Sequence, residues 1–192
     1  GYCLMSNHVH LIARPLREDA LARAIGRAHQ RHARRVNLLR GWTGHLWANR
    51  FYSTPLDDLH LWTAIKYVEL NPVRAGLAAR AEDWPWSSAR AHAGLARDPL
   101  LAAGRPFGGQ RPHPLTGRPL AWGDWLALGV DGDYAERLRL ATRTGRPCGS
   151  EAFVKKLEAL LERRLTPQKR GPKSQKKENP GEAGIVQGRP FR

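Results

Sequence analysis

Cysteine and methionine are scarce in this chain, and long apolar runs are missing from it. The 192 residues include two cysteines, Cys3 and Cys148, and one methionine. Two cysteines are too few for a disulfide framework or for a zinc site built from cysteine thiolates. No apolar run is long enough to cross a membrane. We therefore expect a cytoplasmic protein without a membrane partner.

Acidic residues are also in short supply. The sequence holds 17 Asp and Glu against 32 Lys and Arg, which gives a net charge of +15. An excess of positive charge this large favours a polyanionic partner, and nucleic acid is the commonest one. The chain opens with Gly1, not with methionine, and leads directly into a strand-like segment. We therefore expect upstream sequence to be missing.

The spacing of apolar and turn-forming residues predicts a mixed chain of helices and strands. Two strands are expected on either side of the turn-forming pair Ser6-Asn7. Asp57 or Asp58 is expected to cap a helix that Pro72 ends. In chain order, the predicted elements are strands over 2–6 and 8–13, a helix over about 18–39, a strand over 45–54, a helix to Leu70, and helices near 133–142 and 150–164.

Composition divides the chain into four regions. Residues 1–97 hold most of the patterned segments, and residues 98–122 are rich in proline and glycine and are predicted to be a linker. Residues 123–166 are predicted to be helical, and their last two helices loosely resemble a helix-turn-helix. Residues 167–192 form a basic tail that we expect to be disordered when free, because it has little apolar surface to bury.

Two groups of cationic side chains are candidates for contact with phosphate. One lies along a single face of the helix predicted over 18–39, and it comprises Arg23, Arg27, Arg31 and Arg34. Few acids lie nearby to neutralise this face, so phosphate contact and an ordinary solvated face both stay open. The other group is in the tail, where Lys169, Arg170 and Lys173 could follow a groove or bind phosphate without sequence preference.

Two histidines flank a valine in the second predicted strand. Side chains alternate along a strand, so His8 and His10 would point the same way, while Val9 points to the other face. Two imidazoles side by side can hold a divalent metal ion. They can also form a partly exposed strand face with nothing bound. The histidine pair alone does not choose between these two readings.

A second group of polar residues ends the helix predicted to run to Leu70. Tyr67 and Asn71 are four residues apart, so they share a face near the helix end. If that face meets the histidine strand, the site would combine imidazoles, an amide oxygen, a phenol and the nearby cations Lys66 and Arg74. Such a site could hold Mg²⁺ or Mn²⁺ against a phosphate, and a cation favours the phenolate that attacks phosphorus.

These residues lie in blocks that resemble the single-tyrosine HUH transposases, in particular the REP-associated tyrosine transposases and their insertion-sequence relatives. The name HUH stands for His, hydrophobic residue, His, which this chain writes within residues 2–11 (YCLMSNHVHL). The other matching blocks are residues 66–77 (KYVELNPVRAGL), residues 82–90 (EDWPWSSAR) and, more weakly, residues 44–51 (GHLWANRF). The blocks cover residues 1–95 in the expected order.

The resemblance implies an α+β fold, a ferredoxin-like antiparallel sheet with packed helices that presents the histidine pair to a divalent metal ion. It makes residues 1–97 the catalytic domain, Tyr67 the nucleophile, and His8, His10 and Asn71 the metal ligands. The expected substrate is single-stranded DNA beside a hairpin, cleaved and rejoined through a 5′-phosphotyrosine by a monomer or homodimer.

The chain departs from the family pattern at its start. Family members carry some tens of residues before the His-x-His strand, which form the first strand and helix of the core. We therefore expect an N-terminally truncated domain with a helical basic C-terminal extension. Two alternatives follow: a remnant that binds hairpin DNA without cutting it, or a metal-dependent phosphodiesterase that uses water and does not need Tyr67.

Overall fold

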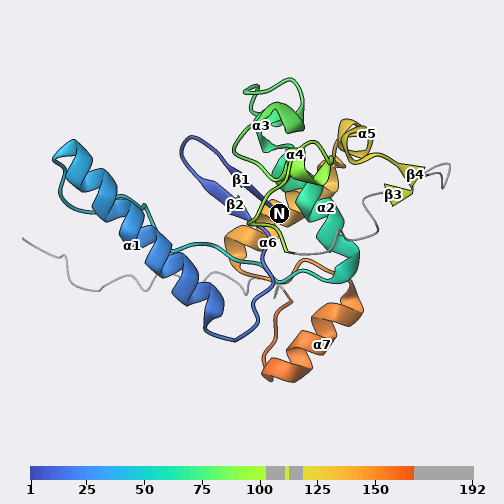
Figure 1. Cartoon of the computed structure of the whole chain (residues 1–192). Helices are drawn as coiled ribbons and strands as arrows, with labels where there is room; N and C mark the ends of the chain where they lie inside the picture. Colours follow the sequence, from blue (N-terminus) through green and yellow to red (C-terminus); the bar gives the residue numbers. More distant parts are fainter. Residues whose placement is uncertain (103–110, 113–118, 167–192) are drawn as a thin grey trace, which may run out of the picture.

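The structure is a computed structural model that describes residues 1–102, 111–112 and 119–166. The described residues form a mixed α/β fold that is mostly helical, with two small antiparallel sheets of two strands each (Figure 1). The mixed class predicted from the sequence is confirmed. In chain order the elements are β1 Tyr2–Leu4, β2 Val9–Leu11, α1 Ala20–Arg40, α2 Asp58–Glu69, α3 Asn71–Arg74, the 3₁₀ turn η1 Ala81–Asp83, α4 Ala89–His92, β3 Arg111–Pro112, β4 Pro119–Leu120, α5 Trp122–Ala127, α6 Gly132–Thr144 and α7 Glu151–Leu161.

The predicted N-terminal hairpin is confirmed. Strands β1 and β2 pair antiparallel, with Cys3 opposite His10. The other edge of β1 is also paired, because Leu4 N–H donates to the carbonyl of Trp86 and Ser88 N–H donates to the carbonyl of Tyr2. Strand β1 therefore lies between β2 and the segment at 86–88, and its backbone is covered on both sides.

The core joins the N-terminal and C-terminal parts of the chain. One buried cluster contains Cys3 from β1, Tyr67 and Val68 from α2, and Tyr134 and Leu138 from α6. Burial of apolar side chains is the main stabilising contribution to such contacts. Residues 1–97 and 123–166 are separate regions by composition, but side chains of both pack into this shared cluster.

A second cluster is organised around a buried carboxylate. Glu69 is completely buried, and it accepts hydrogen bonds from Ser88 Oγ at 2.5 Å and from Trp122 Nε1 at 2.7 Å. His92 Nδ1 lies 2.5 Å from the same carboxylate. These bonds satisfy a group that would be costly to bury without partners, and they tie α2 to α4 and α5.

The long helix α1 extends away from the group formed by α2, α4 and α6 (Figure 1). It confirms the helix predicted over 18–39, but none of its residues is fully buried. The returning segment packs on it: the Trp47 ring stacks on His29 at 3.9 Å between centroids, and Trp47 Nε1 donates to the His29 carbonyl.

The strand predicted over 45–54 is wrong. Residues 45–54 are bends and irregular backbone. The aromatic side chains of this segment do not share one face of a strand. Trp47 packs on α1, while Tyr52 is 63% exposed. A segment anchored by its side chains to a neighbouring helix has no backbone partner with which to form a ladder.

The other predicted helices are confirmed. Asp57 caps α2 by accepting from the backbone N–H of His60, and Ser150 caps α7 by accepting from that of Phe153. Helix α2 ends at Glu69 as expected, but Pro72 then lies near the start of the short helix α3, a position that suits proline.

The predicted linker and tail are described only in part. The linker range 98–122 contains β3 and β4, and its last residue, Trp122, begins α5 and is buried. The tail at 167–192, with Lys169, Arg170 and Lys173, lies outside the described residues. None of the described helices is long and apolar enough to cross a membrane.

Candidate active site

The two histidines of the HUH block converge at the start of β2. His8 immediately precedes the strand and His10 lies within it. Their Nε2 atoms are 3.1 Å apart, and their rings meet edge-to-face with centroids 4.8 Å apart. Asn7 Oδ1 lies 2.6 Å from His8 Nδ1, and this contact orients the ring of His8. The strand thus presents two imidazole nitrogens at one point.

The surroundings of His10 keep its ring uncharged. Burial, the neighbouring His8 and the cationic Arg74 together lower the pKa of His10 from 6.5 to about 4. At neutral pH the ring is therefore in the neutral form, which is the form that ligates metal ions.

Tyr67 lies next to His10 on the side of helix α2. It belongs to α2, it is 7% exposed, and its ring meets His10 edge-to-face at 6.4 Å between centroids. The guanidinium carbon of Arg74 lies 4.0 Å from the centroid of the phenol ring. Arg139 Nε, from α6, donates to the hydroxyl oxygen of Tyr67 at 3.1 Å. The phenol is therefore enclosed by the hairpin, α3 and α6, with two guanidinium groups beside it.

A comparison with family models finds a match for the first part of the chain. Residues 1–71 match the model of the family described as Transposase IS200 like. Residues 1–71 are an IS200-like transposase domain. The matched range contains His8, His10, Tyr67 and Asn71, and it ends before Arg74 and Arg139. A comparison with curated proteins found no match, and a comparison with solved structures found none either.

Asn71 ends the matched transposase domain and is fully engaged in hydrogen bonds. Its Nδ2 donates to the carbonyls of Tyr67 and Val68, and its Oδ1 accepts from Arg74 Nη2 at 2.9 Å. The amide thus caps the end of α2 and orients Arg74 over the phenol. Its role as a third metal ligand stays a prediction, in which one oxygen would serve both Arg74 and the ion.

The histidine pair of the transposase domain fits a divalent ion. Adjacent ligands of an octahedral ion at about 2.1 Å are about 3.0 Å apart, close to the 3.1 Å between the Nε2 atoms of His8 and His10. The described residues contain no group of three or more His, Cys, Asp or Glu that could hold a metal ion. Further ligands would therefore include the Asn71 amide or oxygens of water and substrate.

Lys66 is placed differently from the other predicted cations. It is 5% exposed, its ammonium lies 4.7 Å from the centroid of the Trp125 ring, and burial lowers its pKa to about 8. The side chain is packed between α2 and α5. The structure therefore gives no support to the predicted contact between Lys66 and DNA.

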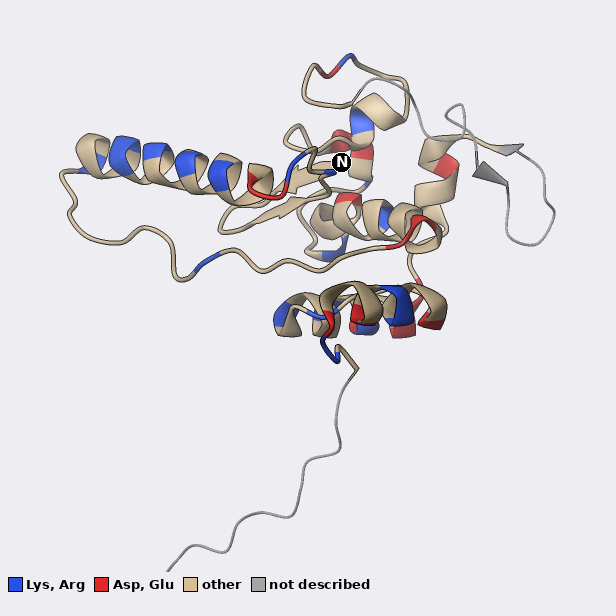
Figure 2. Ribbon diagram, turned by 90° about the horizontal axis from the view of Figure 1, so that it is seen from below, with Lys and Arg blue, Asp and Glu red and all other residues tan. Residues whose placement is uncertain are grey.

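The arginine face of α1 is exposed along its length. Figure 2 shows Lys and Arg along this helix, with acidic residues only at its N-terminal end. There Asp19 pairs with Arg23 at 2.9 Å. Arg27, Arg31 and Arg34 are exposed.

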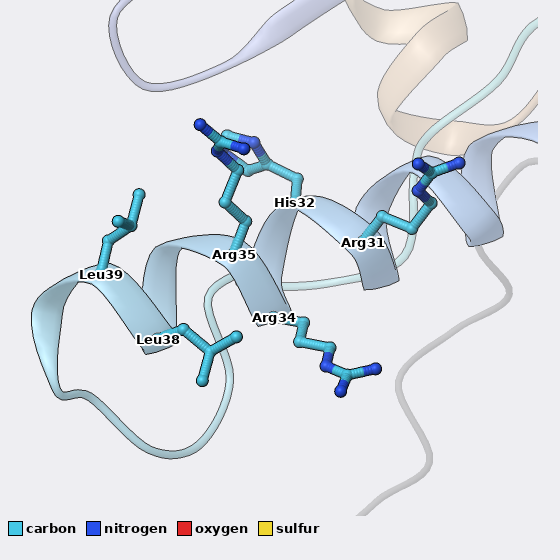
Figure 3. A pocket seen from close by; sticks show the side chains of 6 residues that line it. All are labelled: Arg31, His32, Arg34, Arg35, Leu38 and Leu39. Carbon is cyan, nitrogen blue, oxygen red and sulfur yellow. The ribbon is translucent and has the colours of Figure 1, made fainter.

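A shallow groove lies further along α1. It is lined by Arg31, His32, Arg34, Arg35, Leu38 and Leu39. Figure 3 shows that His32, Arg35 and Leu39 project from one side of the helix, and Arg34 and Leu38 from another.

Arg139 is a site residue that the local sequence pattern does not predict. This residue lies 72 positions after Tyr67, so no local spacing connects the two. The available signal was indirect: the neighbouring Leu138 belongs to an apolar stripe, which indicates that α6 packs against something. Which residues α6 meets is a matter of tertiary structure.

Proposed function

We propose that the protein is a DNA transposase that binds hairpin-forming single-stranded DNA, and cleaves and rejoins it with Tyr67 as nucleophile. The observation that carries this proposal is the contact between Tyr67 and His10, with the His8 and His10 Nε2 atoms 3.1 Å apart. The site brings together a phenol, a pair of imidazole nitrogens and the cations Arg74 and Arg139. The family match supports a DNA substrate.

The reaction needs no outside source of energy. The Tyr67 hydroxyl oxygen attacks phosphorus and gives up its proton to solvent, while the bond from phosphorus to the 3′-oxygen breaks. That oxygen takes up a proton, which leaves a free 3′-hydroxyl and a 5′-phosphotyrosine. Attack by a 3′-hydroxyl reverses the step and rejoins a strand.

His8 and His10 would hold Mg²⁺ or Mn²⁺ in this scheme, with Asn71 as the proposed third ligand. Such an ion polarises a phosphate oxygen and stabilises the charge that develops in the transition state. The protein's own part is to keep His10 uncharged, to orient His8 through Asn7, and to hold the phenol against the pair.

The family's ferredoxin-like sheet is part of the proposal. The hairpin β1–β2, the segment paired with β1 and the packed helix α2 would form part of such a core. DNA would lie across the exposed arginines Arg23, Arg27, Arg31 and Arg34 of α1, with Arg74 at the reaction site. Lys169, Arg170 and Lys173 would add phosphate contacts, and the protein would act as a monomer or homodimer.

One experiment separates this function from its alternatives. The protein is incubated with Mn²⁺ and a pool of labelled DNA hairpins with randomised single-stranded flanks, and then denatured. The proposal requires a labelled covalent protein–DNA species that protease treatment shortens. Cleaved DNA without a covalent species indicates a water-dependent phosphodiesterase. A band shift before denaturation, with no cleavage, indicates a protein that binds hairpins without cutting them.

A further inference from the structure

The hydroxyl of Tyr67 is held by a residue from outside the matched domain. Arg139 Nε–H donates to the Tyr67 oxygen at 3.1 Å, and its guanidinium carbon lies 5.9 Å from the centroid of the ring. Arginine has donors and no acceptor, so the phenol oxygen must be the acceptor in this bond. The hydroxyl proton then points elsewhere and is free to be transferred.

The position of Arg139 is fixed by its helix. Its neighbour Leu138 is 5% exposed, and Leu138 and Ala135 lie in the same buried cluster as Tyr67 and Val68. The backbone that carries Arg139 is therefore anchored directly to the backbone that carries the phenol. The Arg139 side chain itself is exposed. An arginine with this anchoring can meet a ligand that approaches Tyr67 from solvent.

Most of the donors of Arg139 remain available. Within the described residues Arg139 donates its hydrogen bond through Nε, so the two terminal nitrogens can face a phosphate. A guanidinium group binds two phosphate oxygens through parallel hydrogen bonds. Arg74 lies over the ring of the same phenol, with its guanidinium carbon 4.0 Å from the centroid. Two guanidinium groups therefore lie against the phenol that a phosphate would have to approach.

We propose that Arg139 belongs to the reaction site, where Nε positions the Tyr67 hydroxyl and the terminal nitrogens bind the phosphate under attack. This inference rests on the proposed function and extends its site beyond residues 1–71, into α6. Arg139 gains and loses no proton in the reaction. Its charge stabilises the negative oxygens of the transition state, and in the reverse step it stabilises the departing phenol oxygen.

The hydrogen bond is tested without any reaction. The protein is labelled with ¹³C at the ζ carbon of its four tyrosines, and Tyr67→Phe assigns the Tyr67 resonance. Arg139→Gln should move that resonance, whereas Arg143→Gln, an exposed arginine of the same helix, should leave it in place. A resonance that does not move in Arg139→Gln overturns the positioning role.

The contact with phosphate is tested on the pool of hairpins. Arg139→Gln should slow formation of the covalent species by roughly a hundredfold or more, the effect of removing one transition-state donor, while hairpin affinity changes by about threefold or less. Arg139→Lys keeps the charge and should recover at least about tenfold of the loss. Arg143→Gln is the matched control and should react at the parental rate.

The two proposals fail in different ways. If the parental protein forms no covalent species, the proposed function falls, and the resonance of Tyr67 still decides whether Arg139 holds the phenol. If the parental protein reacts and Arg139→Gln reacts equally fast, the function stands and the role of Arg139 is wrong. Equal losses in Arg139→Gln and Arg143→Gln would also overturn it, because a general loss of charge would explain both.

Discussion

Tyr67 differs from Tyr2 and Tyr134 in the hydrogen bond that its hydroxyl makes. Tyr2 donates to the carboxylate of Asp98, and its burial together with that bond raises the pKa of Tyr2 to about 12. Tyr134 donates to the carbonyl of His60, and burial raises its pKa as well. Tyr67 instead accepts a bond from the cationic Arg139. A hydroxyl that donates to an acceptor is bound through its proton, whereas the Tyr67 proton is not committed to Arg139.

The first prediction concerns this hydroxyl. Tyr67→Phe keeps the packed ring and removes the acceptor for Arg139, so we expect the free energy of unfolding to fall by about 1 kcal/mol. Formation of the covalent protein–DNA species should be lost completely. Tyr52→Phe is the matched control, because Tyr52 is 63% exposed; it should form the species as the parent does. Cleavage by Tyr67→Phe at the parental rate would show that water is the nucleophile.

The second prediction concerns the histidine pair. His8→Ala or His10→Ala should abolish cleavage, because each removes one of the two converging Nε2 atoms. Hairpin affinity in a band-shift assay should stay within roughly threefold of the parent, since phosphate contacts elsewhere position the DNA. His45→Ala removes an exposed histidine of the loop after α1 and serves as control. Equal loss of binding and cleavage would instead indicate a structural role for the pair.

At the scale of elements, α1 is held to the rest of the fold by few buried contacts. It has no fully buried residue, and Leu38 and Leu39 are 74% and 72% exposed. Its contacts with the returning segment leave the arginine face open. A helix that is cationic and uncovered on one side is suited to lie along a nucleic-acid backbone.

The third prediction tests that surface. Replacing Arg23, Arg27 and Arg31 with Gln should weaken hairpin binding and reduce the slope of log affinity against log salt by about 0.7 for each lost single-strand contact. The control is the triple replacement of Arg90, Arg97 and Arg163 with Gln, which removes the same charge from exposed positions elsewhere. An equal slope in the two variants would make the α1 face ordinary solvated surface.

Asp57 connects two helices through one carboxylate. Its side chain accepts from the backbone N–H of His60 in α2, and from that of Ser150, the N-cap of α7. Burial alone would raise the pKa of Asp57, but the hydrogen bonds from Ser150 and His60 outweigh it and lower the pKa to about 2. The folded state thus favours the ionised carboxylate.

The fourth prediction follows from that shift. An Asp has a pKa of about 3.9 when unfolded, so the stabilising contribution of Asp57 is present above about pH 4 and is lost as the pH falls towards 2. Asp57→Asn keeps a capping side chain without the charge. We expect it to be about 1–2 kcal/mol less stable than the parent at pH 6, with the difference shrinking below pH 4 in urea melts. A difference that does not change with pH would contradict this.

At the scale of the molecule, local sequence pattern predicted the elements that are determined by interactions between residues close in sequence. The alternation of His8, Val9 and His10 and the turn at Ser6-Asn7 gave the hairpin, and the capping residue Asp57 gave the start of α2. The failures involve partners far away in sequence. Residues 45–54, which include Trp47, favour a strand by composition. The packing of Trp47 on α1 cannot be inferred from the neighbouring sequence. The composition around Trp122 predicts a linker, although its ring is buried in the core and donates a hydrogen bond to Glu69.

The site was predictable to the same extent. The convergence of His8 and His10 follows from strand periodicity. Helix spacing predicted that Tyr67 and Asn71 are neighbours, and the structure places Asn71 at the start of α3, where its amide donates to the carbonyl of Tyr67. The placement of Lys66 inside the core and of Arg139 beside the phenol depends on how α5 and α6 pack against α2. No spacing within α2 could have shown either contact. The resemblance supplied the proposed roles of His8, His10 and Tyr67, and the fold placed Arg139 beside them.

The shared core leads to the last prediction, that the regions before and after the predicted linker unfold together. Leu138 is 5% exposed and packs in the same cluster as Cys3, Tyr67 and Val68. Leu138→Ala should therefore lower the free energy of unfolding by about 2–4 kcal/mol, while Leu140→Ala, 51% exposed on the same helix, should change it by about 0.5 kcal/mol or less. Hydrogen exchange should show that the amides of β1 and of α6 lose protection by the same amount in Leu138→Ala, because one opening exposes both. If the variant weakened protection in α6 and left β1 at the parental level, the two regions would be separate folding units, and Arg139 would be held less firmly against Tyr67 than the shared cluster implies.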